Sequence, residues 1–483
     1  MANKNLQGIK KFNFFKEEKI EDADKNQKFL PYNLNHLTPT TLRIYDKYYY
    51  VSGKLKEDKS ANKQNLFRIV KVNQSGKLLE EYVPFTDSII DFDIIKFDNK
   101  PYIVAIGTDL KSKEDKSQAK AKINPNKEIR KIEVVPTPDT ISCIKIFDMS
   151  NPQTEVEQKN EIVDEKKKDK EKDKKKELGI LKTNDIIYLF YKKENPGDIF
   201  KGNNLSNLPD GYVPILDIPC FSVSPKLNSV SFSYGTYVVE INFELSQKDK
   251  PIQTQLFSIF SPDKKKITNL RYAIFGVESY LYFTTNDSIY YKKVGDPKAN
   301  KPSLVGDENL HYGSDPNNFD VNSERSIIFS TSVTYYIEEF NWMGNDYQLL
   351  TTKAFERQTR FTKFFKKYYV FVLYQEEKPT LCVYDPQNNI FITLDDYKSK
   401  DFLSVIIENE RIYLLAVGSE GNKILCLKEC DNKDKFDTFY KKNFFDVAYT
   451  FGKNLGYEKK SYLKFQNYML NIYIIKTKIM KNL

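Results

Sequence analysis

The chain has 483 residues, which is too long for one ordinary hydrophobic core, although a radial array of small sheets can include them in one unit. Hydrophobic residues make up 40% of the chain, and its 33 Tyr and 34 Phe favour β-strands. The 75 basic residues face 66 acidic ones, so the net charge of +9 does not by itself indicate nucleic-acid binding.

Cysteine content and hydropathy indicate the compartment. The five cysteines are an odd number in a long chain, which argues against a disulfide scaffold and favours a reducing environment. Residues 1–12 lack the apolar run of a signal peptide. No window approaches 18 uncharged apolar residues, so we expect no transmembrane helix and a soluble, cytoplasmic protein.

Short strand-like runs separated by turn residues follow one another along most of the chain. The clearest hairpin joins residues 279–285 and 288–294 through Asn286-Asp287. When only the last strand of each group is followed, the later runs recur at roughly the 40–50 residues of a four-stranded propeller blade. The seven runs are residues 66–72, 141–148, 236–242, 288–294, 332–337, 379–385 and 423–429.

Seven runs predict a mainly β fold, a seven-bladed WD40-like β-propeller, over residues 1–435. A tandem of β-sandwiches or two smaller barrels are the alternatives. We also predict that residues 12–15 pair with the last blade and close the ring like a clasp, with Phe12 and Phe14 facing a blade core.

Two charged stretches are expected to be solvated loops of this propeller. The insertion at residues 153–178 resembles a polybasic arm, but residues 155–177 hold nine Lys and nine acidic residues. A membrane-binding segment needs an excess of basic residues. Residues 111–131 are a second mixed stretch, predicted to be an exposed loop of the second blade.

The pattern changes from strand to helix at residues 436–457, FDTFYKKNFFDVAYTFGKNLGY. Asn443 and Asp446 are spaced as a capping box, and Gly456 suits a helix C-terminus. Residues at helical spacing form two apolar stripes, Phe436, Phe439 and Tyr440, and then Phe444, Phe445, Ala448, Phe451 and Leu455. Residues 436–483 therefore predict a helix pair that opens an α-solenoid. Its rings should pack on the β region or on further helices, because each exposed Phe forgoes about 1.5–3 kcal/mol.

The sequence contains no recognisable catalytic constellation. The two histidines, His36 and His311, are far apart and have no ligand cluster beside them. Cys426 and Cys430 lack the second pair that a zinc site needs, and no Walker or dinucleotide motif occurs. The basic and aromatic run at residues 357–367 leads directly into a strand, so we interpret it as part of a blade rather than as a surface for single-stranded nucleic acid. We predict no enzyme, no cofactor and no metal site.

Motifs at both ends of the propeller resemble a known family. FYKKNFFD at residues 439–446, followed by Ala448, resembles the propeller-to-solenoid junction of the vacuolar protein sorting protein eleven family. Residues 11–15, KFNFF, resemble the start of that family, while residues 144–148 and 382–388 are similar to the ends of its second and sixth blades.

This family is a subunit of the class C core shared by the HOPS and CORVET tethering complexes. The resemblance implies a non-catalytic scaffold in vesicle docking, membrane fusion and protein transport, peripheral on late endosome and lysosome or vacuole membranes. It implies other class C subunits as partners and, through them, Rab GTPases and SNARE proteins. The interaction residues expected at the junction are Phe439, Tyr440, Lys441, Lys442, Asn443, Phe444, Phe445 and Phe451.

Family members continue into a long solenoid and a zinc-binding RING finger, and this chain has neither beyond the first helices, so no zinc is expected. Residues 466–483 also depart from the expected helical repeat. We expect a C-terminally truncated form, which folds as a propeller, self-associates through its C-terminus and does not recruit the core subunits alone. Trimming at about Lys435 is expected to leave the propeller folded.

Other function classes remain open on the sequence. Another propeller–solenoid scaffold, such as a vesicle coat or ciliary transport subunit, would share the same pattern. A propeller enzyme would need a carboxylate or metal cluster at the central mouth, and a nucleic-acid binder would need one strongly positive rim.

Overall fold

The computed structural model describes the blades of the propeller and the helices that follow them. The described residues are 14–17, 34, 37–56, 67–73, 78–82, 84–97, 100–110, 140–150, 154–155, 180–181, 185–202, 211–216, 218–224, 229–244, 253–294, 301–306, 318–330, 336–344, 346–355, 357–375, 378–394, 401–418, 421–442, 444–453, 455–456 and 467.

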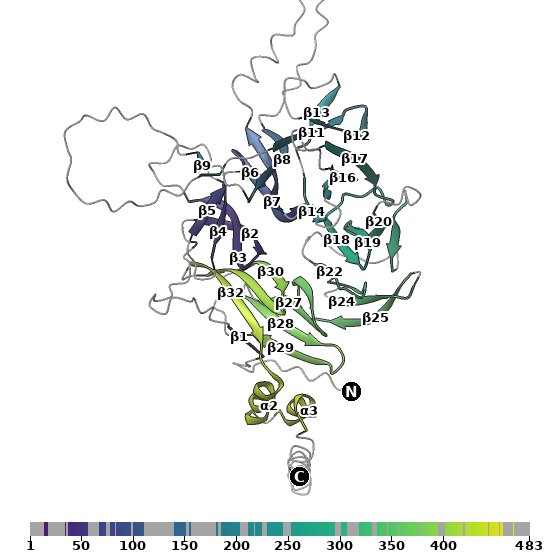
Figure 1. The fold of residues 1–483 in the computed structure, drawn as a ribbon. Helices are drawn as coiled ribbons and strands as arrows, with labels where there is room; N and C mark the ends of the chain where they lie inside the picture. Colours follow the sequence, from purple (N-terminus) through teal and green to yellow (C-terminus); the bar gives the residue numbers. More distant parts are fainter. Residues whose placement is uncertain are drawn as a thin grey trace, which may run out of the picture.

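The described strands form seven sheets around a central channel, so the chain is mainly β and adopts a seven-bladed β-propeller (Figure 1). Within each blade the first three strands pair antiparallel in chain order, from an innermost strand beside the channel toward the outer edge. Aromatic and β-branched side chains suit strands that are buried on both faces between neighbouring blades. The second strands are therefore almost continuously buried.

Blades 1 and 2 hold the first strands of the ring. Blade 1 consists of β2 (Leu37–Tyr45), β3 (Tyr48–Leu55), β4 (Phe67–Val72) and β5 (Leu78–Tyr82). Blade 2 consists of β6 (Ser88–Phe97), β7 (Lys100–Leu110), β8 (Thr140–Asp148) and β11 (Asp185–Lys192), and β12 (Asn195–Gly202) and β13 (Tyr212–Pro214) pair with β11.

Blades 3, 4 and 5 are four-stranded. Blade 3 consists of β14 (Phe221–Ser224), β15 (Ser229–Tyr234), β16 (Tyr237–Glu244) and β17 (Gln253–Phe260). Blade 4 consists of β18 (Asn269–Phe275), β19 (Glu278–Thr284), β20 (Ile289–Lys293) and β21 (Ser303–Val305). Blade 5 consists of β22 (Phe319–Val321), β23 (Ile327–Ser330), β24 (Tyr336–Trp342) and β25 (Tyr347–Ala354). The predicted hairpin across Asn286-Asp287 is confirmed as β19–β20.

Blades 6 and 7 complete the ring. Blade 6 consists of β26 (Thr359–Phe365), β27 (Tyr368–Gln375), β28 (Lys378–Asp385) and β29 (Ile390–Leu394). Blade 7 consists of β30 (Asp401–Glu408), β31 (Arg411–Gly418) and β32 (Gly421–Glu429), with β1 (Phe15–Glu17) from the N-terminus as its outermost strand. The basic run at residues 357–367 includes β26, as the sequence interpretation expected.

The predicted N-terminal clasp is confirmed by the pairing of β1 with β32. Phe15 lies opposite Glu429 in antiparallel register, and the Cys430 amide donates to the Phe14 carbonyl oxygen at 2.9 Å. Phe14 and Phe15 are 1% and 5% exposed. Phe12 lies outside the described residues. The first strand therefore joins the two ends of the propeller, which is the step that closes the ring.

The seven repeated runs prove to be third strands rather than the last strands of their blades. They coincide with or overlap β4, β8, β16, β20, β24, β28 and β32, and in every blade at least one further strand lies between this strand and the outer edge. An outermost strand is hard to recognise in the sequence where its apolar signal is weak. Only one of the eight residues of β25 is buried, whereas seven consecutive residues of β8 are buried.

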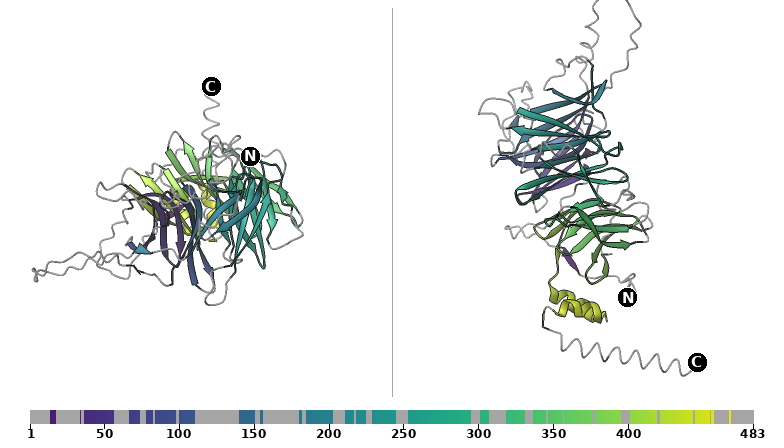
Figure 2. Two further views of the ribbon diagram at one scale, coloured as in Figure 1. Left: turned by 90° about the horizontal axis from the view of Figure 1, so that it is seen from above. Right: turned by 90° about the vertical axis from the view of Figure 1, so that its right-hand side faces the viewer.

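Two helices follow the last blade, α2 (Asn432–Lys441) and α3 (Phe445–Lys453), and they lie beside β1 and β32 at the periphery of the ring (Figures 1 and 2). Asp431 caps α2, since its carboxylate accepts from the Asp434 amide at 2.7 Å. The helical part thus begins earlier than the boundary expected at residue 436. Gly456 has φ +70°, the left-handed conformation expected after a helix.

Several sequence-based expectations fall on residues outside the described part of the chain. These are the loop at 111–131, most of the insertion at 153–178, His36, His311, Asn443 and nearly all of 466–483. Within the insertion, β9 (Thr154–Glu155) pairs with β10 (Ile180–Leu181), which joins β5 in parallel. The connection between the third and fourth strands of blade 2 therefore widens blade 1. Among the described residues, no helix has the length and apolar content needed to cross a membrane.

Candidate functional site

The junction between propeller and helices is built around one shared hydrophobic cluster. Phe439 of α2 and Phe451 of α3 are 1% and 4% exposed, and their rings stack at 5.6 Å. Both belong to the cluster formed by the facing sides of blades 6 and 7, as do Val447 and Ala448 of α3. The helix pair is therefore packed against the propeller and extends its core.

Phe14 connects all three parts of this junction. Its ring meets Tyr368 of β27 edge-on at 5.2 Å and Phe451 of α3 at 6.0 Å. Phe15 meets Phe365 of β26 at 5.3 Å. The strand that closes the ring thus also forms part of the surface on which the helices pack.

Lys435 of α2 lies inside this aromatic cluster, with its side chain 1% exposed. Its ammonium group contacts the Glu429 carboxylate at the end of β32 and lies 4.2 Å from the centroid of the Phe14 ring. The Tyr368 and Phe451 rings are 5.5 and 5.2 Å away. Burial lowers the pKa of Lys435, and the Glu429 carboxylate opposes that shift. An ion pair and three aromatic faces therefore hold α2 in place.

The predicted interaction residues separate into a buried and an accessible group. Phe439 and Phe451 are buried, as described above, so neither is available to another chain. Phe444 and Phe445 are half-buried. Tyr440 is also half-buried, with its ring 5.4 Å from Phe436 and 5.3 Å from Phe445.

Lys441 is exposed and Lys442 half-buried at the end of α2, so the accessible part of the junction is an aromatic surface edged by basic residues. Sequence reasoning missed Lys435 and Glu429. The sequence did hold a signal that Lys435 faces the propeller. Lys435 lies four residues before Phe439, which places the two side chains on the same face of the helix.

The second candidate site is the central channel, a cavity of about 1290 Å³ lined mainly by the inner strands and also by residues of β24, β25 and β27. The enzyme alternative requires a carboxylate or metal cluster at this central mouth. The charged side chains around this cavity are Arg43, Asp91, Asp93, Arg271, Asp320, Glu324, Glu339, Lys363, Lys366, Lys367 and Glu408.

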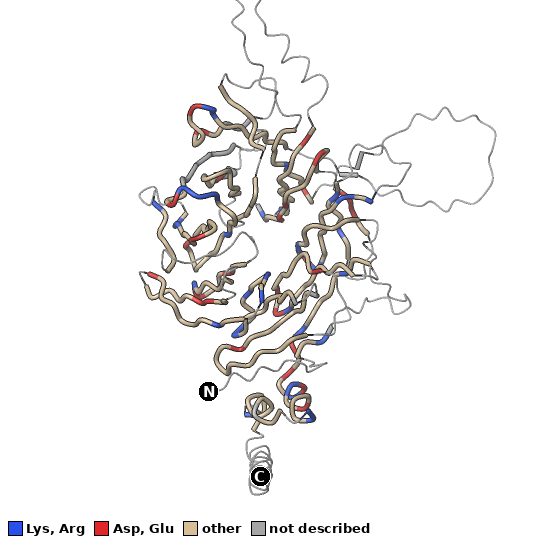
Figure 3. Tube along the Cα trace, turned by 180° about the vertical axis from the view of Figure 1, so that it is seen from behind, with Lys and Arg blue, Asp and Glu red and all other residues tan. Residues whose placement is uncertain are grey.

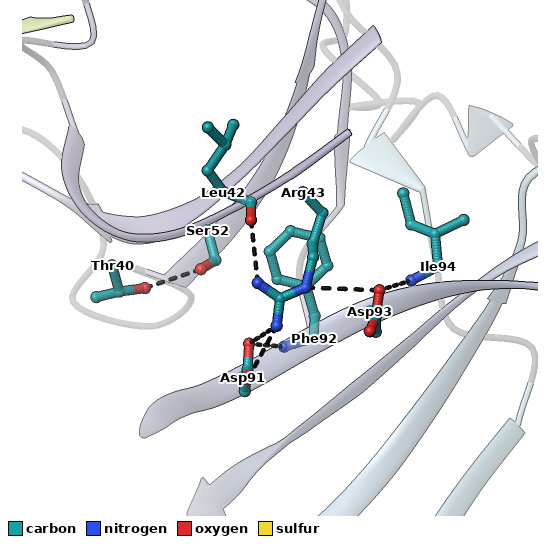
Figure 4. A network of polar contacts seen from close by, with 8 residues as sticks. All are labelled: Thr40, Leu42, Arg43, Ser52, Asp91, Phe92, Asp93 and Ile94. Atoms are coloured by element: carbon teal, nitrogen blue, oxygen red, sulfur yellow. Dashed lines mark hydrogen bonds and ion pairs between the residues drawn. The ribbon is translucent and has the colours of Figure 1, made fainter. Parts of the chain in front are cut away.

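Arg43 of β2 joins blade 1 to blade 2 across the channel wall (Figure 4). Its Nη2 donates to both Asp91 oxygens at 3.0 and 3.1 Å, and its Nε lies 3.5 Å from Asp93. The guanidinium also covers the Phe92 ring at 5.7 Å. Burial raises the pKa of Asp91 and of Asp93, and Arg43 opposes both shifts. Both carboxylates are thus engaged by one arginine.

Similar contacts join blades 4, 5 and 6. Arg271 of β18 pairs with Asp320 of β22 at 2.5 Å, and the other Asp320 oxygen accepts from the Phe364 amide at 2.9 Å. The Tyr369 hydroxyl of β27 donates to Glu339 of β24. Burial raises the pKa of Glu339, with the tyrosine hydrogen bond opposing the rise. These polar groups hold neighbouring blades together.

Metal and redox chemistry have few candidate residues in the described structure. Within the described ranges, no group of three or more His, Cys, Asp or Glu is arranged to hold a metal ion. The five cysteines are buried as free thiols, and burial raises the pKa of Cys430. Lys and Arg are interspersed with Asp and Glu around the described ring (Figure 3).

No family model and no curated protein matches the sequence. Among solved structures, a catalytically inactive virginiamycin B lyase from Staphylococcus aureus with quinupristin is 11% identical over 86% of this chain and 99% of its own, with a TM-score of 0.45. The β-propeller domain of Cps50 (Swd1) from Myceliophteria thermophila is 9% identical over 81% and 96%, with a TM-score of 0.46. The β-propeller domain of the Trilobed protease from Pyrococcus furiosus is 9% identical over 81% and 93%, with a TM-score of 0.41.

Proposed function

We propose that this protein is a non-catalytic scaffold subunit of an endolysosomal membrane-tethering complex and acts through protein–protein contacts. The sequence FYKKNFFD at residues 439–446 carries the proposal, because it resembles the junction of the vacuolar protein sorting protein eleven family. The position of this motif supports it. Phe439 lies in the core shared with blades 6 and 7, and Lys441 and Phe445 lie near the surface beside it.

A scaffold must hold its modules in a fixed relative orientation, and the junction between the propeller and the helices is built in a way that can do this. Phe14, Lys435 and Glu429 connect the ring closure, the last blade and the first helix within one buried cluster. A helix anchored in this way has a set orientation relative to the propeller. Pairing of Asp91, Asp93 and Asp320 with Arg43 and Arg271 further favours a structural role for that part of the channel wall.

The test is affinity purification from the native cell, with a tag placed at the N-terminus of the product of its own gene. Recovery of class C tethering subunits with the tagged gene product would support the proposal, and the 483-residue chain expressed separately tests the expectation that it does not recruit them by itself. A Phe444→Asp, Phe445→Asp double variant should recover less of them, whereas Val277→Asp, at a site 90% exposed on blade 4, should not. Recovery of vesicle coat or ciliary transport subunits in place of tethering subunits would overturn the proposal in favour of another propeller–solenoid scaffold.

A further inference from the structure

The central channel contains carboxylates that no basic residue of its wall neutralises. The three aspartates of the wall are paired with arginines, as described above. Three further carboxylates line the same cavity, and in the described part of the chain none of them forms an ion pair: Glu324, Glu339 and Glu408. Because a charge that is removed from water normally has a partner, these carboxylates indicate a ligand of opposite charge.

The lysines of the cavity wall are engaged by other groups. Lys366 and Lys367 pair with carboxylates that lie outside the cavity lining. The Lys363 ammonium group lies 3.5 Å from the Phe319 carbonyl oxygen. Six carboxylates and five basic side chains line the cavity, and two of those five are already neutralised from outside it. The channel therefore has an excess of negative charge, although the whole chain carries a net charge of +9.

Glu339 of β24 is the most deeply buried of the three carboxylates, at 8% exposure. One of its oxygens accepts from the Tyr369 hydroxyl, and among the described residues its other oxygen has no hydrogen-bond partner. Burial raises the pKa of Glu339, the tyrosine hydrogen bond opposes the rise, and the nearby Glu324 carboxylate adds to it. No basic group contributes to this shift. A cation beside Glu339 would stabilise its charged form and offset the repulsion from Glu324.

The groups around Glu339 suit an alkyl ammonium ion. Asn341 lies two residues further along β24 and also lines the cavity, and within the described ranges its buried Oδ1 has no hydrogen-bond partner. This oxygen can accept from an ammonium group beside Glu339. Leu350 of β25 lines the same cavity and is 59% exposed. Methylene groups attached to an ammonium ion can cover such an apolar side chain.

We propose that the channel binds a linear aliphatic polyamine, with one ammonium group at Glu339 and Asn341 and its methylene groups against Leu350. Carboxylates on three different blades favour a ligand with several separated positive charges over a single inorganic cation. The cavity of about 1290 Å³ also exceeds the roughly 300–1,000 Å³ of most small-molecule sites, so it has room for an extended chain.

Calorimetric titration of the full chain with spermidine tests this site. We expect saturable binding that Glu339→Gln weakens by about tenfold or more, because the amide keeps the Tyr369 hydrogen bond and removes the charge. Glu194→Gln, at an exposed carboxylate between β11 and β12, should bind as the wild type does. Leu350 allows a test of sign at an accessible position, since Leu350→Glu should strengthen binding and Leu350→Lys should weaken it.

Three results would overturn the inference: titration without saturation, equal binding by Glu339→Gln and the wild type, or full displacement of spermidine by Mg²⁺ at the same concentration of charge. A lysine-rich peptide that binds more tightly than spermidine would assign the channel to the side chains of a partner protein, which also excludes the small ligand. None of these measurements involves the tethering subunits, so the proposed function is tested separately by its own purification experiment.

Discussion

Lys435 of α2 and Glu429 of β32 form an ion pair at the point where the propeller ends and the helices begin. The Lys435 side chain is 1% exposed and the Glu429 side chain 13%. Lys366, at the turn between β26 and β27, approaches the second Glu429 oxygen at 3.1 Å. The Glu429 carboxylate therefore forms two ion pairs, one with the buried ammonium group of Lys435 and one with the more exposed ammonium group of Lys366.

This arrangement predicts an asymmetry between the two partners. Glu429→Gln leaves the Lys435 charge buried among aromatic rings, which should lower the free energy of unfolding by about 3 kcal/mol. Lys435→Met fills the same space and leaves Glu429 paired with Lys366, so we expect a loss of less than about 1.5 kcal/mol. Urea unfolding monitored by fluorescence measures both. Lys433→Met, at an exposed position of the same helix, is the control, and equal losses for the two main variants would contradict the argument.

The clasp makes a second prediction. Phe14 is 1% exposed and touches the last blade, blade 6 and α3, so Phe14→Ala removes a buried ring at the closure of the propeller. We expect a cost of about 3–5 kcal/mol, seen as a lower unfolding midpoint. Val277→Ala, which shortens a side chain that is 90% exposed, should leave the midpoint unchanged. If Phe14→Ala melted like the wild-type chain, β1 would be a loose tail.

The sequence predicted the repeat better than the boundaries of its blades, and particular residues show why. The run at 141–148 stands out because almost all of β8 is buried, whereas β25 exposes Leu349 and Leu350 and looks like a loop. Ring closure was predictable from aromatic residues near the N-terminus. The junction was only partly predictable. A lysine on a helix, such as Lys435, is usually expected to face solvent, and the carboxylate that pairs with it, Glu429, lies in a strand.

Glu339 predicts a dependence of stability on pH. Burial raises its pKa in the folded chain above the unfolded value, so the folded state binds the proton more tightly. The stability contributed by the protonated group is present at acid pH and is lost as the pH rises through the unfolded and then the folded pKa. Glu339→Gln removes this loss while its amide oxygen can still accept from Tyr369. The variant should therefore melt above the wild type at pH 7.5 and converge with it near pH 4. A constant difference across that range would exclude titration of Glu339 as the cause.

Removing the helices gives the last prediction, and it differs from the expectation drawn from the sequence. Trimming near Lys435 looked harmless when the helices were considered a separate module. In the structure, Phe439, Val447, Ala448 and Phe451 are each no more than 5% exposed and share one cluster with blades 6 and 7.

A chain ending at residue 431 would leave Phe14 and Tyr368 facing water, at about 1.5–3 kcal/mol for each large apolar side chain that loses its cover. We expect this chain to unfold at a lower urea concentration than a chain ending at residue 456, which retains both helices, and to bind a dye specific for exposed apolar surface. Coincident unfolding curves for the two truncations would mean that the propeller is stable without α2 and α3 and that the shared cluster adds little to its stability.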